Sequence, residues 1–178
     1  MIGLGLGVGK GSVYGSGGGG GVTYIAASTF SLQEASSTGS VVSVVTSQAD
    51  DNGVTKTDVV KLVAGQNLSA SNNVFTITSS GISDLVDGST VNATYSFYYP
   101  SANVGDSTDS ICNLLVGSTT GSANKISGSN TNLGEWNTVT GTLTVGSSTN
   151  TLLVEVDDAG GGRMREDDEF YLAEVRVF

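Results

Sequence analysis

Histidine is absent from this sequence of 178 residues. Its absence excludes Ser-His-Asp and Cys-His catalysis, and it removes the commonest general base and the commonest zinc ligand. A hydrolase that works with two carboxylates stays open, because the chain has 17 aspartates and glutamates. Such an enzyme needs a substrate cleft walled by aromatic side chains, and aromatic residues make up only 7% of the chain. We therefore predict that the protein is not an enzyme.

Cysteine and proline each occur once. The single cysteine, Cys112, excludes an intrachain disulfide, and its place in the stretch ICNLLV predicts a small buried side chain. One proline is too few for a proline-rich linker or a collagen. No window reaches the roughly 18 consecutive apolar residues that a membrane-spanning helix requires.

Positive charge is also scarce. The chain has 7 lysines and arginines against 17 acids, which gives a formal net charge of -10 and a pI of about 4.1. This balance disfavours binding to nucleic acid through phosphate neutralisation, and it disfavours adhesion to an anionic membrane. We therefore expect neither as a partner.

An export signal is missing from the N-terminal stretch. Glycine interrupts its apolar residues, and Lys10 follows those residues instead of preceding them. A signal peptide has the opposite order and a continuous apolar segment. The expectation is a protein made in a host cytoplasm without a signal peptide.

Glycine, by contrast, is abundant, above all at the N-terminal end of the chain. Eleven of the 26 glycines fall within residues 1–21, where apolar residues alternate with glycine at the period of a strand. Glycine has the largest backbone entropy cost on ordering, so such a stretch orders only against a neighbouring surface. We predict an extended anchoring arm over residues 1–21, and a disordered terminus is the alternative. The expected arm contacts are Ile2, Leu4, Leu6, Val8 and Tyr14.

Residues 22–178 show strand patterns almost throughout. The runs are short, rich in valine, threonine, isoleucine and aromatic residues, and bounded by glycine, serine, asparagine and aspartate. The best helical segment, Ile82–Val86, is one turn at most. The predicted strands are Val22–Ala26, Val41–Thr46, Thr57–Val63, Asn73–Thr78, Thr90–Tyr99, Ser110–Val116, Asn137–Val145, Thr149–Glu155 and Glu169–Phe178.

The number and spacing of these strands predict the fold class. About nine short strands with turn signals between them are typical of an all-β protein in which two antiparallel sheets form a jelly-roll sandwich. Alternate residues would be buried between the sheets, among them Phe75 with Ile77, and Val139 with Leu143 and Val145. The face of the last strand is predicted to carry Tyr171, Ala173, Val175 and Val177. The domain is expected over residues 22–178, preceded by the arm over residues 1–21.

Three stretches resemble the jelly-roll carbohydrate-binding modules that accompany many polysaccharide hydrolases. They are LVDGSTVNATYSFYY, GEWNTVTGTLTVGSSTNTLLVEV and DDEFYLAEVRVF. Asp87-Gly88 leads into the aromatic strand, and Trp136 precedes a strand containing Val139, Gly141 and Thr142. The likeness covers roughly residues 41–178. It implies a β-sandwich and the binding of sugars by exposed aromatic side chains.

The resemblance and the strand period together assign sides to the aromatic residues. The family's tryptophan lies in the core, and Trp136 is expected there too. Tyr95, Phe97 and Tyr99 share one face of their strand, and Tyr98 lies on the other. The expected glycan contacts, on or near the loop after this strand, are Tyr98, Tyr99, Asn103 and Asp106.

Calcium is the cofactor that the acidic residues suggest. The family often closes with two adjacent acids that support a structural calcium ion, but here the first position is Ala173 and only Glu174 remains. A second group of acids lies around the glycine-containing stretch 160–162, and carboxylates are hard ligands suited to Ca²⁺. Its candidate ligands are Glu155, Asp157, Asp158, Asp167 and Asp168. Arg163 and Arg165 could neutralise these acids instead, so no cofactor is the main expectation.

Two functions fit these features. The first is a structural virion protein, a capsid or tail decoration, fibre or spike subunit of a bacteriophage, which docks through its arm and displays the sandwich. It is motivated by the missing export signal, the serine-, threonine- and asparagine-rich surface, the lack of catalytic side chains and the arm, and it resembles accessory virion proteins in style. Its partners would be other virion subunits in a homo-oligomer, with a cell-surface glycan as a further partner. The alternative is a free or appended carbohydrate-binding module or lectin-like adhesin.

Overall fold

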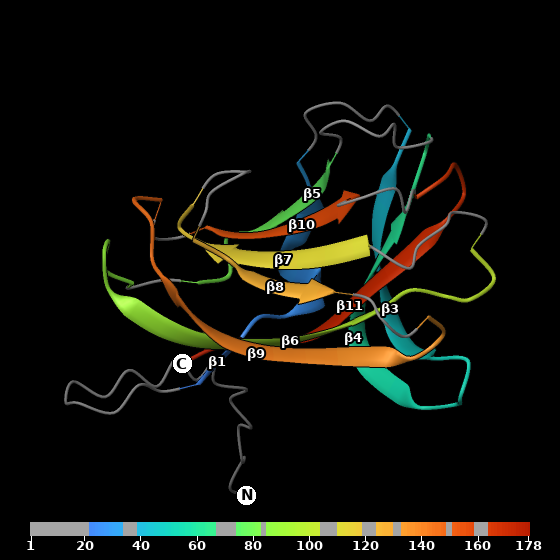
Figure 1. Ribbon diagram of the computed structural model, residues 1–178, viewed down its shortest axis with the longest axis horizontal. Helices are drawn as coiled ribbons and strands as arrows, with labels where there is room; N and C mark the ends of the chain where they lie inside the picture. The colour runs from blue at the N-terminus through green and yellow to red at the C-terminus, as the bar shows by residue number, and fades with distance from the viewer. Residues whose placement is uncertain are drawn as a thin grey trace, which may run out of the picture.

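The alternating runs form two antiparallel sheets that lie face to face, as the computed structural model in Figure 1 shows. The structure describes residues 22–33, 39–66, 74–82, 85–103, 110–118, 124–129, 133–148, 151–158 and 164–178. These residues form eleven strands and one short 3-10 helix. The element bounds are β1 Thr23–Tyr24, η1 Ala27–Thr29, β2 Phe30–Leu32, β3 Val41–Ala49, β4 Thr55–Val63, β5 Val74–Ser79, β6 Thr90–Tyr98, β7 Ser110–Val116, β8 Ile126–Ser129, β9 Trp136–Thr144, β10 Leu152–Asp158 and β11 Glu169–Val177.

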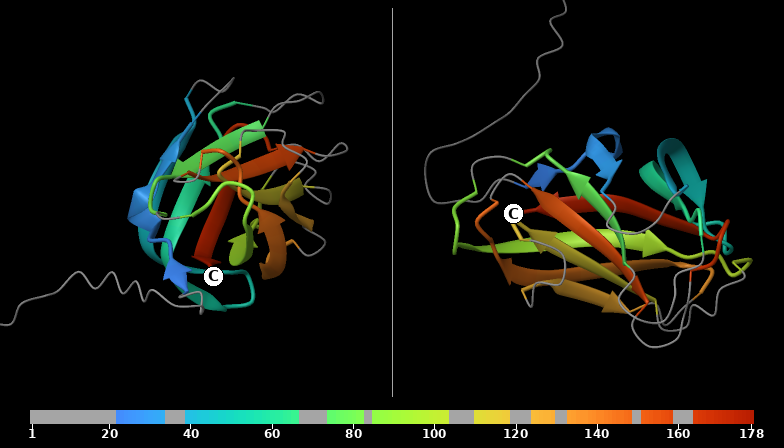
Figure 2. Two further views of the ribbon diagram at one scale, coloured as in Figure 1. Left: turned by 90° about the vertical axis from the view of Figure 1, so that its left-hand side faces the viewer. Right: turned by 90° about the horizontal axis from the view of Figure 1, so that it is seen from above.

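The strands divide into two sheets, which we call sheet A and sheet B. Sheet A has the order β3-β4-β11-β6-β9, with β1 paired to β11 beyond the end of β4. Sheet B has the order β2-β5-β10-β7-β8. Figure 2 shows the two layers from the side and from above, with the C-terminus beside β1. The all-β, two-sheet sandwich predicted from the sequence is confirmed.

The core lies between the inner faces of the sheets. Phe75 and Ile77 of β5 and Phe97 of β6 are almost completely buried. Tyr95 joins the sheets, because its hydroxyl donates to the carbonyls of Cys112 (2.6 Å) and Ile126 (3.1 Å) in sheet B. Burial raises the pKa of Tyr95, so the phenol stays a neutral donor.

All nine predicted strands are present, with ends that shift by a few residues, and Ser110–Val116 matches without any shift. Two strands escaped prediction, β2 and β8, because both are too short or too polar to show an alternation. In β8 the reason for glycine is visible: a Cβ on Gly128 would lie 2.6 Å from Val139 and 2.8 Å from Phe97. The turn suggested at Ile82–Val86 is not seen in its described residues, and the 3-10 helix lies at Ala27–Thr29 instead.

The predicted face of the last strand was wrong in its first half. Tyr171 and Ala173 point to the outside of sheet A, where they pack with Tyr98, whereas Val175 and Val177 are in the core. A bulge causes the change, because the pairing with β6 shifts between Ala173 and Arg176, and Glu174 has a φ of +54°. One extra residue in a strand moves every later side chain to the opposite face.

Residues 1–21 lie outside the described residues, so the predicted arm and its boundary at residue 22 stay predictions. No helix in the described part of the chain has the length and apolar character needed to cross a membrane.

Candidate functional site

Three aromatic rings lie side by side on the outer face of sheet A. Tyr171 of β11 is paired with Tyr98 of β6, which is paired with Trp136 of β9, so the three side chains share one row across the sheet. Ring centroids are 5.4 Å apart in both Tyr98–Tyr171 and Tyr98–Trp136. We call this set the aromatic row. Its two tyrosines are 3% exposed, and Trp136 is half-buried.

Two lysines from β4 lie over the ends of the aromatic row. The Nζ atom of Lys56 is 5.8 Å from the centroid of Trp136, and that of Lys61 is 5.6 Å from the centroid of Tyr171. Ammonium groups at this distance are attracted to the negative face of an aromatic ring. The lysines therefore belong to the same surface as the rings.

Each lysine also forms an ion pair with a residue of β11. Lys56 lies 2.6 Å from Glu174, and Lys61 bonds to Glu169, which also accepts the Tyr171 hydroxyl. The Lys56 bond holds the pKa of Glu174 below its usual range. Burial acts to raise the pKa of Glu169, but the bonds from Lys61 and Tyr171 outweigh it and the pKa is lowered. Both carboxylates are thus fixed in their charged form.

The turn between β3 and β4 closes one end of the aromatic row. Asp51 accepts a 2.6 Å hydrogen bond from the Tyr98 hydroxyl, and it also accepts bonds from the backbone and hydroxyl of Ser101. The Ser101 and Tyr98 bonds lower the pKa of Asp51. Its neighbour Asp50 accepts the backbone N–H of Trp136. Two adjacent carboxylates thus hold three segments together.

A column of short polar side chains continues from the aromatic row along β6 and β9. Its pairs are bonded across the strands, with Ser96 2.8 Å from Thr138 and Thr140 donating to Thr94 at 2.9 Å. We call this set the hydroxyl strip. It consists of Thr90, Asn92, Thr94 and Ser96 on β6 and Thr138, Thr140, Thr142 and Thr144 on β9. The β9 members are exposed, so they present a row of hydroxyl groups to solvent.

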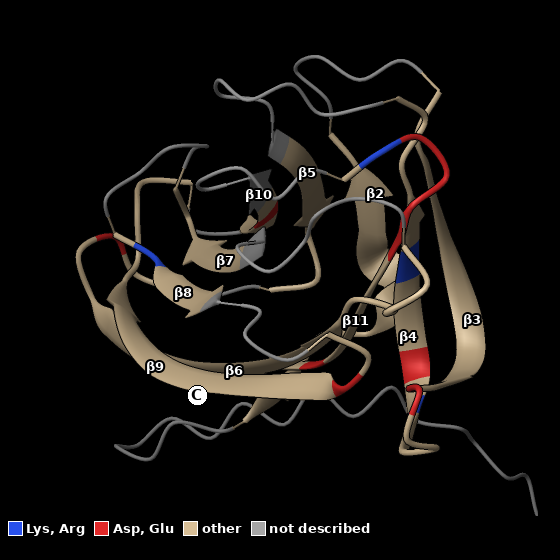
Figure 3. Ribbon diagram, turned by 45° about the vertical axis from the view of Figure 1, so that its right-hand side comes forward, with Lys and Arg blue, Asp and Glu red and all other residues tan. Residues whose placement is uncertain are grey.

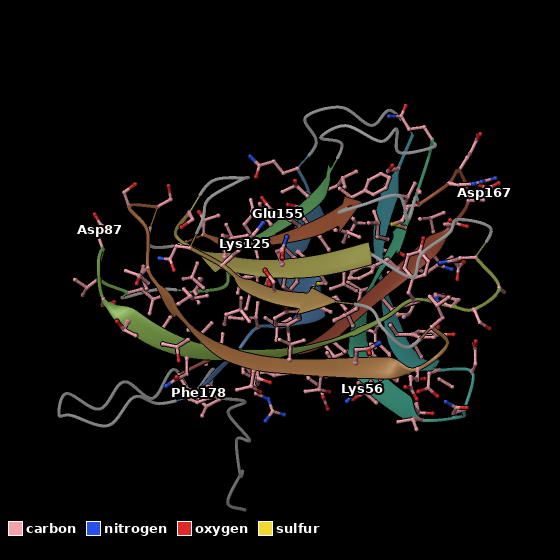
Figure 4. The ribbon with its side chains drawn as sticks, in the orientation of Figure 1. Lys56, Asp87, Lys125, Glu155, Asp167 and Phe178 are labelled. Carbon is pink, nitrogen blue, oxygen red and sulfur yellow. The ribbon has the colours of Figure 1, made fainter. Side chains whose placement is uncertain are left out.

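A second polar group lies on the outer face of sheet B. Glu155 of β10 is 1% exposed, with Lys125 at 3.7 Å and the Asn113 amide nitrogen at 3.5 Å. Figure 4 shows Glu155 and Lys125 together at sheet B, with Lys56 on the opposite side of the molecule. The Asn113 Oδ1 atom is buried without a hydrogen-bond partner. In the described residues of this face, the rings that border the sheet A site have no counterpart.

The predicted glycan contacts are only partly brought together. Tyr98 lies on the outer face as expected, but Tyr99 is 1% exposed in the core, so its ring is not available to a ligand. Asn103 is occupied on both sides of its amide, which donates to the Glu169 carbonyl and accepts the Glu169 N–H. Asp106 lies outside the described residues.

The expectation that Trp136 lies in the core, as the family's tryptophan does, is wrong. Its ring packs against Tyr98 at the outer face in a tilted arrangement, and its indole N–H donates to the Val54 carbonyl at 3.1 Å. The sequence carried a signal that we did not use. Trp136 has the same parity along β9 as Thr138 and Thr140, and the opposite parity to Val139.

The acids predicted to hold calcium are separated. Asp168 caps the turn before β11, where it accepts the Arg165 N–H at 2.8 Å, and Asp167 occupies that turn with a φ of +71°. Glu155 lies on sheet B, and the side chains of Asp157 and Asp158 are outside the described part. Among the side chains that the structure describes, no three His, Cys, Asp or Glu residues form a metal-binding group.

The predicted arm contacts cannot be placed. Ile2, Leu4, Leu6, Val8 and Tyr14 all lie outside the described residues. Sequence reasoning also missed Lys56, Lys61 and the hydroxyl strip, because lysines and threonines in strands indicate only a solvent-facing side.

Comparisons with known proteins support the fold. No protein-family model matches the chain, and no curated protein is significantly similar in sequence. Among solved structures, the xylanase 10B CBM22-1–GH10 modules of Clostridium thermocellum, complexed with xylohexaose, match 86% of this chain and 26% of theirs, with 13% identity and a TM-score of 0.51. The chain thus spans about a quarter of that xylanase chain. The CBM22-1 xylan-binding domain of Paenibacillus barcinonensis Xyn10C matches over 85% of this chain and 86% of its own, with 9% identity and a TM-score of 0.50.

A bacteriophage protein is also among the matches. Tailspike protein 4 of bacteriophage CBA120 matches over 85% of this chain and 19% of its own, with 10% identity and a TM-score of 0.48, a likeness too weak to carry an argument. The expected virion role therefore gains no support from these comparisons. What they show is that the chain has a β-sandwich similar to those of carbohydrate-binding modules.

Proposed function

We propose that the protein binds a glycan chain on the outer face of sheet A. The observation that supports this proposal most directly is the partly exposed Trp136 ring. It lies beside the Lys56–Glu174 pair, at one end of the hydroxyl strip. Sugars are recognised by an aromatic ring that packs on their apolar face and by polar groups that bond their hydroxyls. The likeness of the fold to xylan-binding modules supports the same reading.

Each group has a defined part in this proposal. Trp136 supplies the stacking surface, while Glu174, whose side chain is 40% exposed, accepts hydrogen bonds from sugar hydroxyls. Lys56 donates to the same sugar. Thr138, Thr140 and Thr142 bond further sugars along β9, and their spacing of two residues, roughly 7 Å, favours an extended oligosaccharide over a monosaccharide.

Retardation in native gels that contain soluble xylan, mixed-linkage β-glucan or galactan tests the proposal. The wild type is expected to be retarded by at least one of the three. Trp136→Ala is expected to weaken retardation about ten-fold, which corresponds to roughly 1.4 kcal/mol. Thr140→Val keeps the shape of the side chain and removes its hydroxyl, so it should weaken binding by a smaller factor.

Ser127→Val is the matched control, because Ser127 is an exposed hydroxyl on the outer face of sheet B. It should leave retardation unchanged. If Ser127→Val weakens binding while Thr140→Val does not, the ligand lies on sheet B and the site is misassigned. If no polysaccharide retards the wild type, the proposed function is contradicted.

The virion role and the location in a virus particle stay predictions. A glycan-binding sandwich is compatible with them, since a particle also needs a surface that holds its host. The absence of enzyme activity likewise stays a prediction that a hydrolysis assay on the same polysaccharides would test.

A further inference from the structure

Among the described residues, β3 is an edge strand of sheet A that no further strand covers. It is nine residues long, VVSVVTSQA, and contains neither a charged residue nor a proline. Figure 3 shows it at the right-hand border of the sheet, uncharged along its whole length. Proteins usually protect such edges with lysine, proline, a bulge or a covering segment, because exposed backbone groups pair with other chains.

The other strands with a free edge are shorter than β3 or have a side chain bonded to their backbone. The edges of sheet B are β2 and β8, which have three and four residues. β9 has its last backbone groups bonded to Asn124, which donates to the Thr144 carbonyl and accepts the Thr144 N–H. Among the edges that the described residues form, β3 is therefore the long one without such protection.

One side of β3 is apolar and incompletely covered. Val42 and Val44 lie opposite the core residues Leu62 and Val60, so they point to the inner face of the sheet. Yet Val44 is 47% exposed. A further strand beside β3 would cover it if that strand presented apolar side chains inward.

The segment Ile2–Val8 has the composition that this edge requires. Leu4, Leu6 and Val8 would lie on one side of a strand, and the intervening glycines would leave the other side free of side chains. We propose that the chain's own residues Ile2–Val8 add to the free edge of β3 as a further strand. The apolar side chains then extend the core over Val42 and Val44.

The connection is long enough for the same chain to reach. Residues 9–21 separate the segment from β1, and 13 residues span up to roughly 43 Å. β3 is two strands away from β11, roughly 10 Å to the side. Attachment through a short flexible linker gives an effective concentration on the order of millimolar, so the chain's own segment outcompetes that of a second copy.

A segment that covers its own edge and an arm that joins subunits predict opposite effects of damaging the segment. If the segment covers the edge, damaging it should expose β3 and promote association. If the segment joins subunits, damaging it should yield monomers. The two cases are separated by light-scattering mass across protein concentrations, using the full chain in every variant.

The central variant is Leu4→Asp/Leu6→Asp. It is expected to raise the average mass with concentration, while the wild type stays monomeric. Adding Val44→Lys should restore the monomer, because a charge on the edge blocks pairing. Ser12→Asp/Ser16→Asp is the matched control, which adds the same charge elsewhere in residues 1–21 and should behave as the wild type.

A disulfide trap tests the contact itself. Leu6→Cys/Val44→Cys is oxidised in the full chain, where the native Cys112 is 1% exposed and burial raises the pKa of its thiol. A bond within one chain, at monomeric mass, supports the proposal. Bonds only between chains, or no bond in this variant or in the Leu4→Cys and Val8→Cys equivalents, overturn it, as does a wild type that is multimeric and dissociates in Leu4→Asp/Leu6→Asp. None of these outcomes depends on glycan binding.

Discussion

On the outer face of sheet A, Glu169 and Glu174 are partly exposed, and each bonds directly to a lysine. On the outer face of sheet B, Glu155 is 1% exposed, and Lys125 and Asn113 lie at 3.7 and 3.5 Å. The carboxylates of sheet A keep part of their surface in contact with water while they bond to lysine. On sheet B the Glu155 carboxylate is buried, so removing Lys125 takes away a charge that compensates it. Both lysines of the sheet A pairs lie on β4.

The largest expected effect is on the aromatic row. Tyr98→Ala removes a buried ring that contacts two others and should lower the free energy of unfolding by about 4 kcal/mol. Tyr98→Phe keeps the ring, loses the bond to Asp51, and should cost about 1 kcal/mol. Urea denaturation measures both. Similar losses in the two variants would mean that the hydroxyl, and not the ring, stabilises this face.

Lys125→Met probes the other face. Removing the cation takes a compensating charge from beside the buried Glu155 carboxylate, at an expected cost of about 3 kcal/mol. The double variant Lys125→Met/Glu155→Met should recover that loss, because a buried pair can be replaced by apolar side chains of similar size. Equal stability of Lys125→Met and the wild type would show that the two faces do not differ as described.

The smallest expected effect is on how the free energy of unfolding falls at acid pH, through the carboxylates of sheet A. The pKa values of Asp51, Glu169 and Glu174 are lowered by their partners, so their stabilising contribution is complete above roughly pH 5 and is lost as pH falls through the lowered values. Glu174→Gln should therefore show a smaller fall in unfolding free energy between pH 5 and pH 3 than the wild type. Asp87→Asn, at an exposed loop position, serves as control. An unchanged slope in Glu174→Gln would contradict the lowered pKa.

The sequence allowed the fold to be predicted further than the site. Clear alternation located strands such as Asn73–Thr78 and placed Phe75 and Ile77 inside, because burial at every second residue is a local property. The aromatic row joins β6, β9 and β11, which are distant in sequence, so its three rings could not be grouped without the strand order. β8 was missed because the sequence ISGS has the composition of a turn, and its glycine is required by Phe97 and Val139 from the facing sheet.

Because of the bulge at Glu174, side chains of the same parity point to opposite faces of sheet A in the two halves of β11. Before it, Tyr171 and Ala173 serve the outer surface, and after it Val175 and Val177 serve the core. If β11 paired with all its residues but without the bulge, strict alternation would turn either the tyrosine inward or the valines outward. In most strands, inserting or deleting one residue moves the side chains that follow it to the wrong face. In β11 the native sequence already contains one such extra residue. One strand can therefore supply side chains of this parity to both the outer face and the core only as long as the bulge is kept.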